Sequence, residues 1–472
     1  MLFHLIKIEI FYLCIMSKVK KAWFCQNCGA ESTKWLGRCP SCGEWNTFAE
    51  EIISAPGRQE VLTTAAKAVP IGEISTAQQE RISLNNSEME RILGGGLVPG
   101  SVVLLGGEPG IGKSTLSLQI PLHAPELRTL YVSGEESARQ IRMRAQRLLG
   151  GKGAEKMPDN CLVLCETMLE NILEQAQAVK PSLLIVDSIQ TAYSQHLESS
   201  PGSVTQVREC AALLLRYAKQ THVPVILVGH ITKEGSIAGP KVLEHIVDVV
   251  LQFEGDTTHA YRMLRGIKNR FGSTAELALF EMTGHGLRQV DNPSEMFIPM
   301  HDENLSGIAV AAMIDGTRPF LIETQALVST AAYGTPQRSA NGFDTRRMNM
   351  LLAVLEKRAG FRLAAKDVFL NMAGGLRVAD PAVDLSVVAA ILSSAFDLAI
   401  PARWCFAAEV GLSGEIRPVP HLERRIAEAN RLGFEKIFVS SYNARTHIPK
   451  DTRIAVEKVS GVGPLARQLF KT

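Results

Sequence analysis

The segment Gly107–Ser114 has the residues of a phosphate-binding loop. Its sequence, GEPGIGKS, is a complete G-x-x-x-x-G-K-[ST] pattern between an apolar run and a helix expected over Ser114–Ile120. Glycines allow backbone N–H groups to surround a β-phosphate, and the N-terminus of the following helix favours negative charge. Lys113 is expected to reach the β- and γ-phosphates, and the Ser114 hydroxyl to ligate Mg²⁺. The predicted ATP-binding residues are Gly107, Glu108, Pro109, Gly110, Ile111, Gly112, Lys113, Ser114 and Thr115.

Carboxylates that could complete this site follow two other apolar runs. Asp187 ends the run LLIVD, where it could accept a hydrogen bond from a water on Mg²⁺ beside Ser114. Hydrolysis also needs a group that orients or deprotonates the attacking water. Glu135 and Glu136 follow the run ending at Val132, and we predict Glu135 as this base, with Glu136 in reserve. A solvated acidic loop is the alternative.

His230 ends a further apolar run, which begins at Val225. A side chain at that position could sense the γ-phosphate. A histidine at a strand end is more often a hydrogen-bonded structural residue, and both interpretations stay open.

Four of the nine cysteines have the spacing of a zinc site. Cys25 and Cys28 form one CxxC knuckle and Cys39 and Cys42 form a second, with ten residues between them. Each knuckle offers two thiolates to one point, and four thiolates satisfy tetrahedral Zn²⁺. The alternatives are structural thiols or redox motifs, but a thioredoxin-type motif would open a helix in a βαβ unit that this segment lacks. The spacing predicts a zinc ribbon that serves DNA contact, protein contact or local folding.

Elements that could position these groups follow from the hydrophobic pattern. Short runs rich in Val, Ile and Leu, separated by helical stretches, suit strands buried on both faces of a parallel sheet. These runs are Val102–Leu105, Leu130–Val132, Cys161–Leu164, Leu183–Val186 and Val225–Val228. A second mixed region begins with Ile308–Ile314 and includes a helix expected over Leu385–Ala395. The expected domains are a ribbon at 16–50, a linker at 51–80, an α/β ATPase domain at 81–290 and a further domain at 291–472.

Composition and charge limit the class of protein. The 472 residues are 46% hydrophobic with a net charge of +2, which excludes wholesale disorder, a collagen-like fibre and a multi-span membrane protein. From Ala331 onward there are 20 Lys+Arg and 13 Asp+Glu, so this third carries +7 and the rest −5. A local nucleic-acid site therefore stays open.

The first fifteen residues are apolar but lack the features of an export signal or a membrane span. They contain Lys7 and Glu9 and have no small-residue cleavage site. We expect Met1–Ile15 to be a non-native extension before a start at Met16. A cytoplasmic protein with no membrane partner is the expectation.

The segment Lys268–Gly272, KNRFG, completes a set of motifs with a clear resemblance. Together with LGGGLVPGS at Leu93–Ser101, the GEPGIGKS loop and the cysteine knuckles, it makes the chain from Met16 onward closely resemble the bacterial RadA (Sms) family of DNA-repair ATPases. That family is related to RecA and to the DnaB replicative helicase. The resemblance implies a RecA-like P-loop ATPase core and a homo-hexameric ring that promotes branch migration on single-stranded and branched DNA. It also implies a functional link to RecA.

The resemblance gives Lys268 and Arg270 a role between subunits. Alternating along an expected strand, both side chains would point to one side. Related ring motors place a basic pair here to reach the ATP of the neighbouring subunit, where a cation offsets charge developing on the γ-phosphoryl group. A basic strand facing solvent or DNA phosphate is the alternative.

Similarity to RecA-like motors also indicates two loops that would face DNA. They are Thr191–Arg208 and Ile231–Lys241, which carry Arg208, Lys233 and Lys241. Such side chains could bind the DNA backbone without distinguishing sequence.

The C-terminal region resembles the α+β proteolytic domain of Lon, but without its catalytic residues. The Lon-type nucleophile is a Ser activated by a Lys. Ala382 stands at the Ser position and Arg425 at the Lys position. Alanine has no nucleophile and arginine does not readily give up its proton, so we expect no peptidase activity. A ring-forming surface and a basic platform for duplex DNA are expected instead.

Three hypotheses of function follow from the sequence. The first is a DNA-stimulated ATPase motor of recombinational repair that uses ATP, Mg²⁺ and Zn²⁺. The second is an ATP-dependent protease, and the third is an ATP-regulated assembly protein that does not act on DNA.

Overall fold

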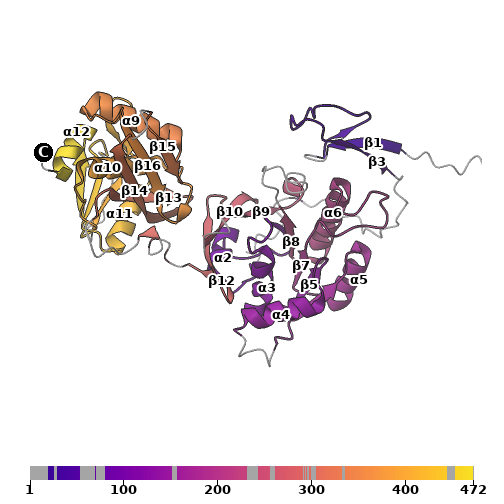
Figure 1. Ribbon diagram of the computed structural model, residues 1–472. Coiled ribbons are helices and arrows are strands. Elements are labelled where there is room, and N and C mark those ends of the chain that lie inside the picture. Colours follow the sequence, from indigo (N-terminus) through magenta and orange to yellow (C-terminus); the bar gives the residue numbers. More distant parts are fainter. Residues whose placement is uncertain are drawn as a thin grey trace, which may run out of the picture. The chain divides into compact units, whose positions relative to one another are not determined.

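The chain divides into two compact units. One comprises Met1–Thr274 with Phe280–Gln289, and the other Ala275–Leu279 with Val290–Thr472. The computed structural model, drawn in Figure 1, describes residues 20–25, 29–53, 70, 80–150, 157–230, 243–255, 261–290, 292, 294, 297–298, 305–331, 335–443 and 452–470. The expected extension at 1–15, Cys28 and the predicted DNA loop at 231–241 lie outside these residues.

A small antiparallel sheet forms the ribbon. Strand β1 (Lys20–Cys25) lies between β2 (Glu31–Ser32) and β3 (Phe48–Ile53). Among its described residues, Cys25, Cys39 and Phe48 form a small buried cluster with Trp23 and Leu36 packed against it, and Ala22 and Phe24 are also buried. So few apolar side chains give little hydrophobic stabilisation without a metal.

A nine-stranded sheet organises the rest of the first unit. Its strands lie in the order β12-β11-β10-β9-β4-β8-β7-β5-β6. The parallel strands are β4 (Val102–Gly107), β5 (Thr129–Ser133), β6 (Cys161–Cys165), β7 (Leu183–Asp187), β8 (Val225–His230) and β9 (Val249–Glu254). Strand β10 (Tyr261–Asn269) is antiparallel to β9, and β11 (Leu277–Thr283) to β12 (Gly286–Gln289). All five strands predicted from apolar runs are present, but β6 is a partly exposed edge strand and is not buried on both faces.

Helices cover both faces of this sheet. They are α2 (Ser87–Leu93), α3 (Lys113–His123), α4 (Ala138–Leu148), α5 (Leu169–Val179) and α6 (Val204–Thr221). Alternate side chains such as Leu104, Val132 and Val186 form one core with α5 and α6. The side chains between them, including Tyr131, point to the opposite face. Buried strands of this kind bring their carboxyl ends, and the loops that follow, to one edge of the sheet.

The second unit contains a mixed seven-stranded sheet in the order β15-β16-β14-β13-β17-β20-β21. Its strands are β13 (Ile308–Asp315), β14 (Arg318–Thr330), β15 (Arg338–Asn341), β16 (Lys366–Met372), β17 (Trp404–Ala407), β20 (Lys436–Ser440) and β21 (Ala455–Val459). The short pair β18 (Glu409–Val410) and β19 (Ile416–Arg417) is separate. The helices are α9 (Thr345–Ala359), α10 (Asp384–Phe396), α11 (Leu422–Arg431) and α12 (Val462–Phe470), with single turns η2 (Ala373–Gly375) and η3 (Pro381–Val383). The predicted strand at 308–314 and helix at 385–395 are thus confirmed.

None of the helices in the described part of the chain combines the length and the apolar character needed to cross a membrane.

Candidate functional site

The predicted phosphate loop joins β4 to α3. Gly112 is the N-cap of α3 with φ 119°, in the region that favours glycine. A Cβ there would lie 2.9 Å from Met282 Cε, so the loop also needs glycine for close packing. On the other side, the buried Arg262 Nε donates a hydrogen bond to Ile111 O at 3.2 Å. The loop is therefore held by β10 and β11 as well as by its own strand.

Lys113 lies inside this loop. Its Nζ donates hydrogen bonds to the carbonyl oxygens of Gly107 and Glu108, both at 2.9 Å, and the residue is only 3% exposed. Burial lowers the pKa of Lys113 to about 8, against the opposing charges of Asp187 and Glu135. A phosphate at this loop would raise the pKa of Lys113 again, because an anion compensates the ammonium better than two carbonyl dipoles do.

Asp187 ends β7 and is held by a tyrosine on the neighbouring strand. Tyr131 Oη donates a hydrogen bond to Asp187 Oδ2 at 2.6 Å, and both residues are buried. Burial, followed by the charge of Asp187, raises the pKa of Tyr131 well above its ordinary value, so the hydroxyl keeps its proton. The other carboxylate oxygen of Asp187, Oδ1, accepts no hydrogen bond from the described residues. It is therefore available to accept one from a metal-bound water.

The two adjacent glutamates have different surroundings. Glu135 Oε1 accepts a hydrogen bond from Ser188 Oγ at 2.7 Å and lies 3.3 Å from His230 Nε2. Glu136 instead pairs with Arg144 on α4. Burial raises the pKa of Glu135, but these two partners and the charge of Lys113 outweigh it, so the pKa lies below its ordinary value. Glu135 is thus an ionised carboxylate beside Lys113 and Asp187, whereas Glu136 is committed to an ion pair.

Several polar atoms at this edge of the sheet have no partner. His230 Nδ1 and both side-chain amide atoms of Gln190 are buried without a hydrogen bond in the described part of the chain. Gln190 follows β7, and His230 ends β8 beside it. Unpaired buried polar groups are costly. A phosphoryl oxygen and a water would satisfy them, which fits an ATP site.

Tyr131, Ser188 and Arg262 were not predicted from the sequence. Tyr131 had a usable signal, because a tyrosine inside a buried strand needs a partner for its hydroxyl. Ser188 and Arg262 had none, since their partners Glu135 and Ile111 are more than fifty residues away.

The predicted basic pair lies together, against residues of its own chain. Lys268 Nζ donates hydrogen bonds to Glu244 O and, at 2.9 Å, to Val247 O. Arg270 Nη1 lies 3.3 Å from Asp248 Oδ1, and its side chain is 53% exposed. Burial and the neighbouring Arg270 lower the pKa of Lys268. Both cations therefore contact the segment 244–248, and the contacts described for them do not include the phosphate loop.

One of the predicted DNA loops differs from expectation. The last residues of Thr191–Arg208 are the first turn of α6, with Ser203 as the N-cap that accepts from Gln206 N. Arg208 is therefore an exposed helical residue rather than a loop residue. A serine cap before an amphipathic stretch was the sequence signal that this prediction overlooked.

Three of the four predicted zinc ligands converge. The Sγ atoms of Cys25, Cys39 and Cys42 lie within 4.8 Å of one another, and Cys25 Sγ is 3.7 Å from Cys42 Sγ. Gly29 and Gly43 follow the knuckles with φ of 73° and 78°. Three thiols aimed at one point fit tetrahedral Zn²⁺, and Cys28 is the candidate for the fourth ligand.

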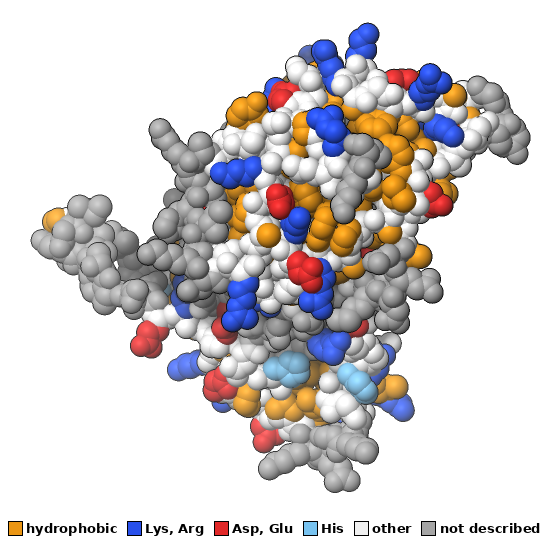
Figure 2. Space-filling view, turned by 90° about the vertical axis from the view of Figure 1, so that its left-hand side faces the viewer, with side chains coloured by type: hydrophobic (Ala, Val, Ile, Leu, Met, Phe, Trp, Pro, Cys, Tyr) orange, Lys and Arg blue, Asp and Glu red, His pale blue; other side chains and the backbone are white. Residues whose placement is uncertain are grey.

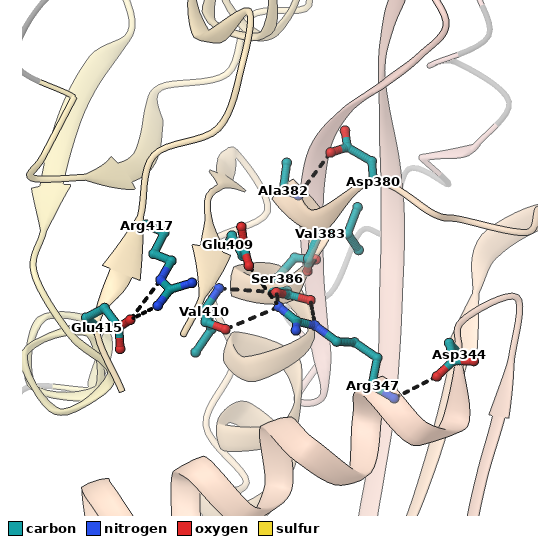
Figure 3. Close-up of polar contacts among 11 residues, drawn as sticks. Asp344, Arg347, Asp380, Ala382, Val383, Ser386, Glu409, Val410, Glu415 and Arg417 are labelled. Atoms are coloured by element: carbon teal, nitrogen blue, oxygen red, sulfur yellow. Dashed lines mark hydrogen bonds and ion pairs between the residues drawn. The ribbon is translucent and has the colours of Figure 1, made fainter. Parts of the chain in front are cut away.

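In the second unit, a buried ion pair lies where a Lon-type protease would have its Ser–Lys dyad. Arg425 is 2% exposed, and its Nη1 contacts Asp380 Oδ2 at 2.6 Å and Ala312 O at 2.9 Å. Asp380 also accepts from Ala382 N at 3.0 Å, as Figure 3 shows. The Arg425 guanidinium is thus held by a carboxylate and a backbone carbonyl, and the nearby Ala382 has no nucleophilic group.

A second buried carboxylate in this unit is held in the same way. Arg347 on α9 pairs with Asp384 at the start of α10 and contacts Val410 O at 3.2 Å (Figure 3). Other basic residues of the unit are also paired, namely Arg417 with Glu415, Arg431 with Glu428 and Lys436 with Glu457. On the face shown in Figure 2, Lys and Arg side chains are dispersed among Asp, Glu and apolar groups. On this face the positive charge is therefore dispersed, and the ion pairs neutralise part of it.

Three segments of the chain match known protein families. Residues 23–50 match the rubredoxin metal binding domain family, 73–236 the AAA domain family, and 324–443 the family of subunit ChlI of Mg-chelatase. The chain has a cysteine zinc ribbon, a RecA-like AAA core and a ChlI/Lon-like C-terminal domain, as predicted.

Full-length relatives are similar over nearly the whole chain. The DNA repair protein RadA of Bacillus subtilis is 47% identical, covering 91% of this chain and 94% of the relative. RadA of Aquifex aeolicus is 49% identical over 90% and 94%, and RadA of Pseudomonas aeruginosa 44% over 93% and 97%. With the phosphate loop, the acidic residues beside it and the converging thiols in place, this chain belongs to the bacterial DNA repair protein RadA family.

Proposed function

We propose that this chain is a DNA-stimulated ATPase of recombinational repair, which works as a hexameric ring and promotes branch migration of strand-exchange products. The observation that carries the proposal is the grouping of Lys113, Asp187 and Glu135 at one edge of the sheet. Membership of the RadA family supports the role in DNA repair. A functional link to RecA, action on single-stranded and branched DNA and a cytoplasmic location are parts of the same proposal.

Each group has a separate task in hydrolysis. Lys113 binds the β- and γ-phosphates, and Ser114 and Asp187 hold Mg²⁺, which when bound neutralises charge on the phosphates. Glu135, kept ionised by Ser188 and His230, orients the attacking water. His230 responds to the γ-phosphate through the side chain that also contacts Glu135.

Lys268 and Arg270 complete the site of a neighbouring subunit. In the single chain their contacts are to the segment 244–248, and the Arg270 side chain is half exposed. An exposed guanidinium held near a fixed carboxylate is available to a phosphate supplied by another subunit. Hydrolysis would then depend on assembly.

The protease reading has no support. Ala382 and the buried Arg425–Asp380 pair leave neither a nucleophile nor a base at that position. In this proposal the C-terminal domain contributes to ring assembly and, through its net positive charge, to duplex DNA contact.

ATP turnover with and without single-stranded DNA tests the proposal. We expect DNA to stimulate the wild-type protein and Glu135→Gln to lower kcat by about a hundredfold or more, a typical contribution of a general base. Glu136→Gln is the matched control, because that residue pairs with Arg144, and it should keep most of the turnover.

Three results would contradict parts of the proposal. Turnover that is unaffected by DNA would favour an ATP-regulated assembly protein. Cleavage of casein in the same assay would favour the protease reading. An equal loss of kcat in the two glutamine variants would mean that Glu135 does not orient the attacking water.

A further inference from the structure

Two tryptophan side chains of the ribbon are exposed to an unusual degree. Trp35 is 50% and Trp45 is 67% exposed. Large aromatic side chains are normally buried, since each carries a large apolar surface. Neither ring belongs to the ribbon core, which is formed by Cys25, Cys39 and Phe48 with Trp23 against it. Local folding therefore does not account for these two rings.

The two rings lie on adjacent segments of the ribbon. Trp45 pairs with Arg38 across an antiparallel bridge, and Gly37 O accepts a hydrogen bond from Asn46 N at 2.7 Å. A Cβ on Gly37 would lie 3.5 Å from Trp35 Cη2, so the edge of the Trp35 ring lies close to the chain at Gly37. Gly37 thus lies beside the Trp35 ring, and its carbonyl oxygen bonds the residue that follows Trp45. The two tryptophans therefore lie on neighbouring segments of the ribbon.

Positive charge accompanies the rings. The Arg38 guanidinium carbon lies 5.7 Å from the centroid of the Trp45 ring, and its Nε donates to Gly43 O at 2.9 Å. Lys34 is exposed next to Trp35. Neither cation has an ion pair with a carboxylate among the described residues. Residues 16–50 contain five Lys+Arg and three Asp+Glu, a net charge of +2.

Open aromatic faces next to cations have the chemistry that binds unpaired nucleotides. Bases stack on tryptophan whatever their sequence, while Arg and Lys contact the phosphates. Paired bases in a duplex are already stacked and do not expose these faces. A ligand that uses both features is single-stranded nucleic acid.

We propose that Trp35 and Trp45, with Lys34 and Arg38, form a stacking site for single-stranded DNA on the zinc ribbon. This site deepens the proposed DNA-dependent function and rests on it. The Cys25, Cys39 and Cys42 cluster holds the segments that carry the rings, so the metal acts here by positioning the aromatic groups.

The test uses the full-length protein and an oligothymidine probe. Stacking requires an aromatic face, whereas a hydrophobic contact does not. We therefore compare the double variant W35L/W45L with W35F/W45F. Leucine should weaken binding of the oligomer by about ten- to a hundredfold, and phenylalanine by only a few-fold. Zinc content, which should equal that of wild type in both variants, shows that the ribbon is folded.

Fluorescence supplies a direct readout of the same site. Oligothymidine should quench the intrinsic fluorescence of the wild-type protein, and the quenching should be lost in W35L/W45L although Trp23 and Trp404 remain. The matched control, Trp23→Phe, should keep it. Lys34→Ala should reduce the salt slope of log K by about 0.7, as for one phosphate contact on a single strand.

Wild-type affinity and quenching in W35L/W45L would overturn the stacking site and assign the two rings to a protein partner. Equal loss in the leucine and phenylalanine variants, with zinc retained, would also overturn it. In either case DNA-stimulated ATP turnover in the wild-type protein would leave the proposed function standing. A wild-type protein whose turnover ignores DNA would instead refute the proposed function.

Discussion

At the scale of single residues, the hydrogen bond from Tyr131 to Asp187 limits how this carboxylate could hold the proposed Mg²⁺. It occupies Oδ2 of a carboxylate that is 8% exposed, and this leaves the orientation of Asp187 fixed before any ligand arrives. Partners of this kind commonly change metal affinity by ten- to a hundredfold. Tyr131 is therefore a positioning residue in the proposed mechanism.

Tyr131→Phe tests this position. Removing the hydroxyl leaves Asp187 Oδ2 without its donor, so we expect the Mg²⁺ concentration for half-maximal ATP turnover to rise by about tenfold. Mg²⁺ titrations at saturating ATP measure it. Tyr217→Phe is the control, because Tyr217 is buried in the same unit on α6 and has no contact with Asp187. Equal shifts in the two variants would mean that Tyr131 acts only through packing.

Residues also show how the two adjacent glutamates differ. Both are glutamates that follow the same strand in the sequence. Their partners differ, because Ser188 contacts Glu135 and Arg144 contacts Glu136. Ser188 is 53 residues from Glu135, and it approaches because β5 and β7 are neighbours in the sheet. The order of strands therefore brings Ser188 to Glu135 and not to Glu136.

At the scale of elements, the ribbon depends on its metal more than any other part. The described part of the ribbon buries only two cysteines, two phenylalanines and one alanine, which cannot supply much hydrophobic stabilisation. The metal-binding free energy would then be most of the folding free energy of this element. The α/β sheet, with its large buried core, has no such dependence.

Removal of zinc by a chelator should therefore unfold the ribbon alone. We expect amide hydrogen exchange to increase strongly in β1 and β3 and to remain unchanged in β4–β9. Cys39→Ser should lose zinc and show the same pattern of exchange. Cys210→Ser should retain zinc, because Cys210 lies on α6 in the core of the α/β sheet and outside the thiol cluster. Protected amides in β1 after zinc removal would contradict the prediction.

At the scale of the whole molecule, the proposed ring makes each ATP site a shared structure. A subunit would supply Lys113, Asp187 and Glu135 to its own site, and Lys268 and Arg270 to the next. Arg270→Ala is expected to be tolerated in the fold, because Asp248 keeps Lys219 Nζ at 2.8 Å and Val102 N at 3.1 Å as partners.

Mixing two inactive variants tests this arrangement. Lys113→Ala and Arg270→Ala should each have little ATP turnover alone. In mixed rings an Arg270→Ala subunit has an intact phosphate loop and receives Arg270 from a Lys113→Ala neighbour, so part of the turnover should return. Mixing Arg270→Ala with the double variant K113A/R270A is the control and should restore none. No recovery in the first mixture would count against a shared site.

The amino-acid sequence by itself determined the features that depend on short spacing. The phosphate loop, the two knuckles and the strand pattern each lie within one loop or one element, where neighbouring residues in the chain are neighbours in space. The loss of the protease dyad was also evident, because it follows from residue types alone at Ala382 and Arg425.

Only the tertiary structure decided the contacts between distant segments. These include the different partners of Glu135 and Glu136, the bond from Tyr131 to Asp187, and the exposure of Trp35 and Trp45 on a small module. The physical reason is that burial and hydrogen-bond partners depend on which strands and loops become neighbours, and the order of strands in a sheet is not the order along the chain.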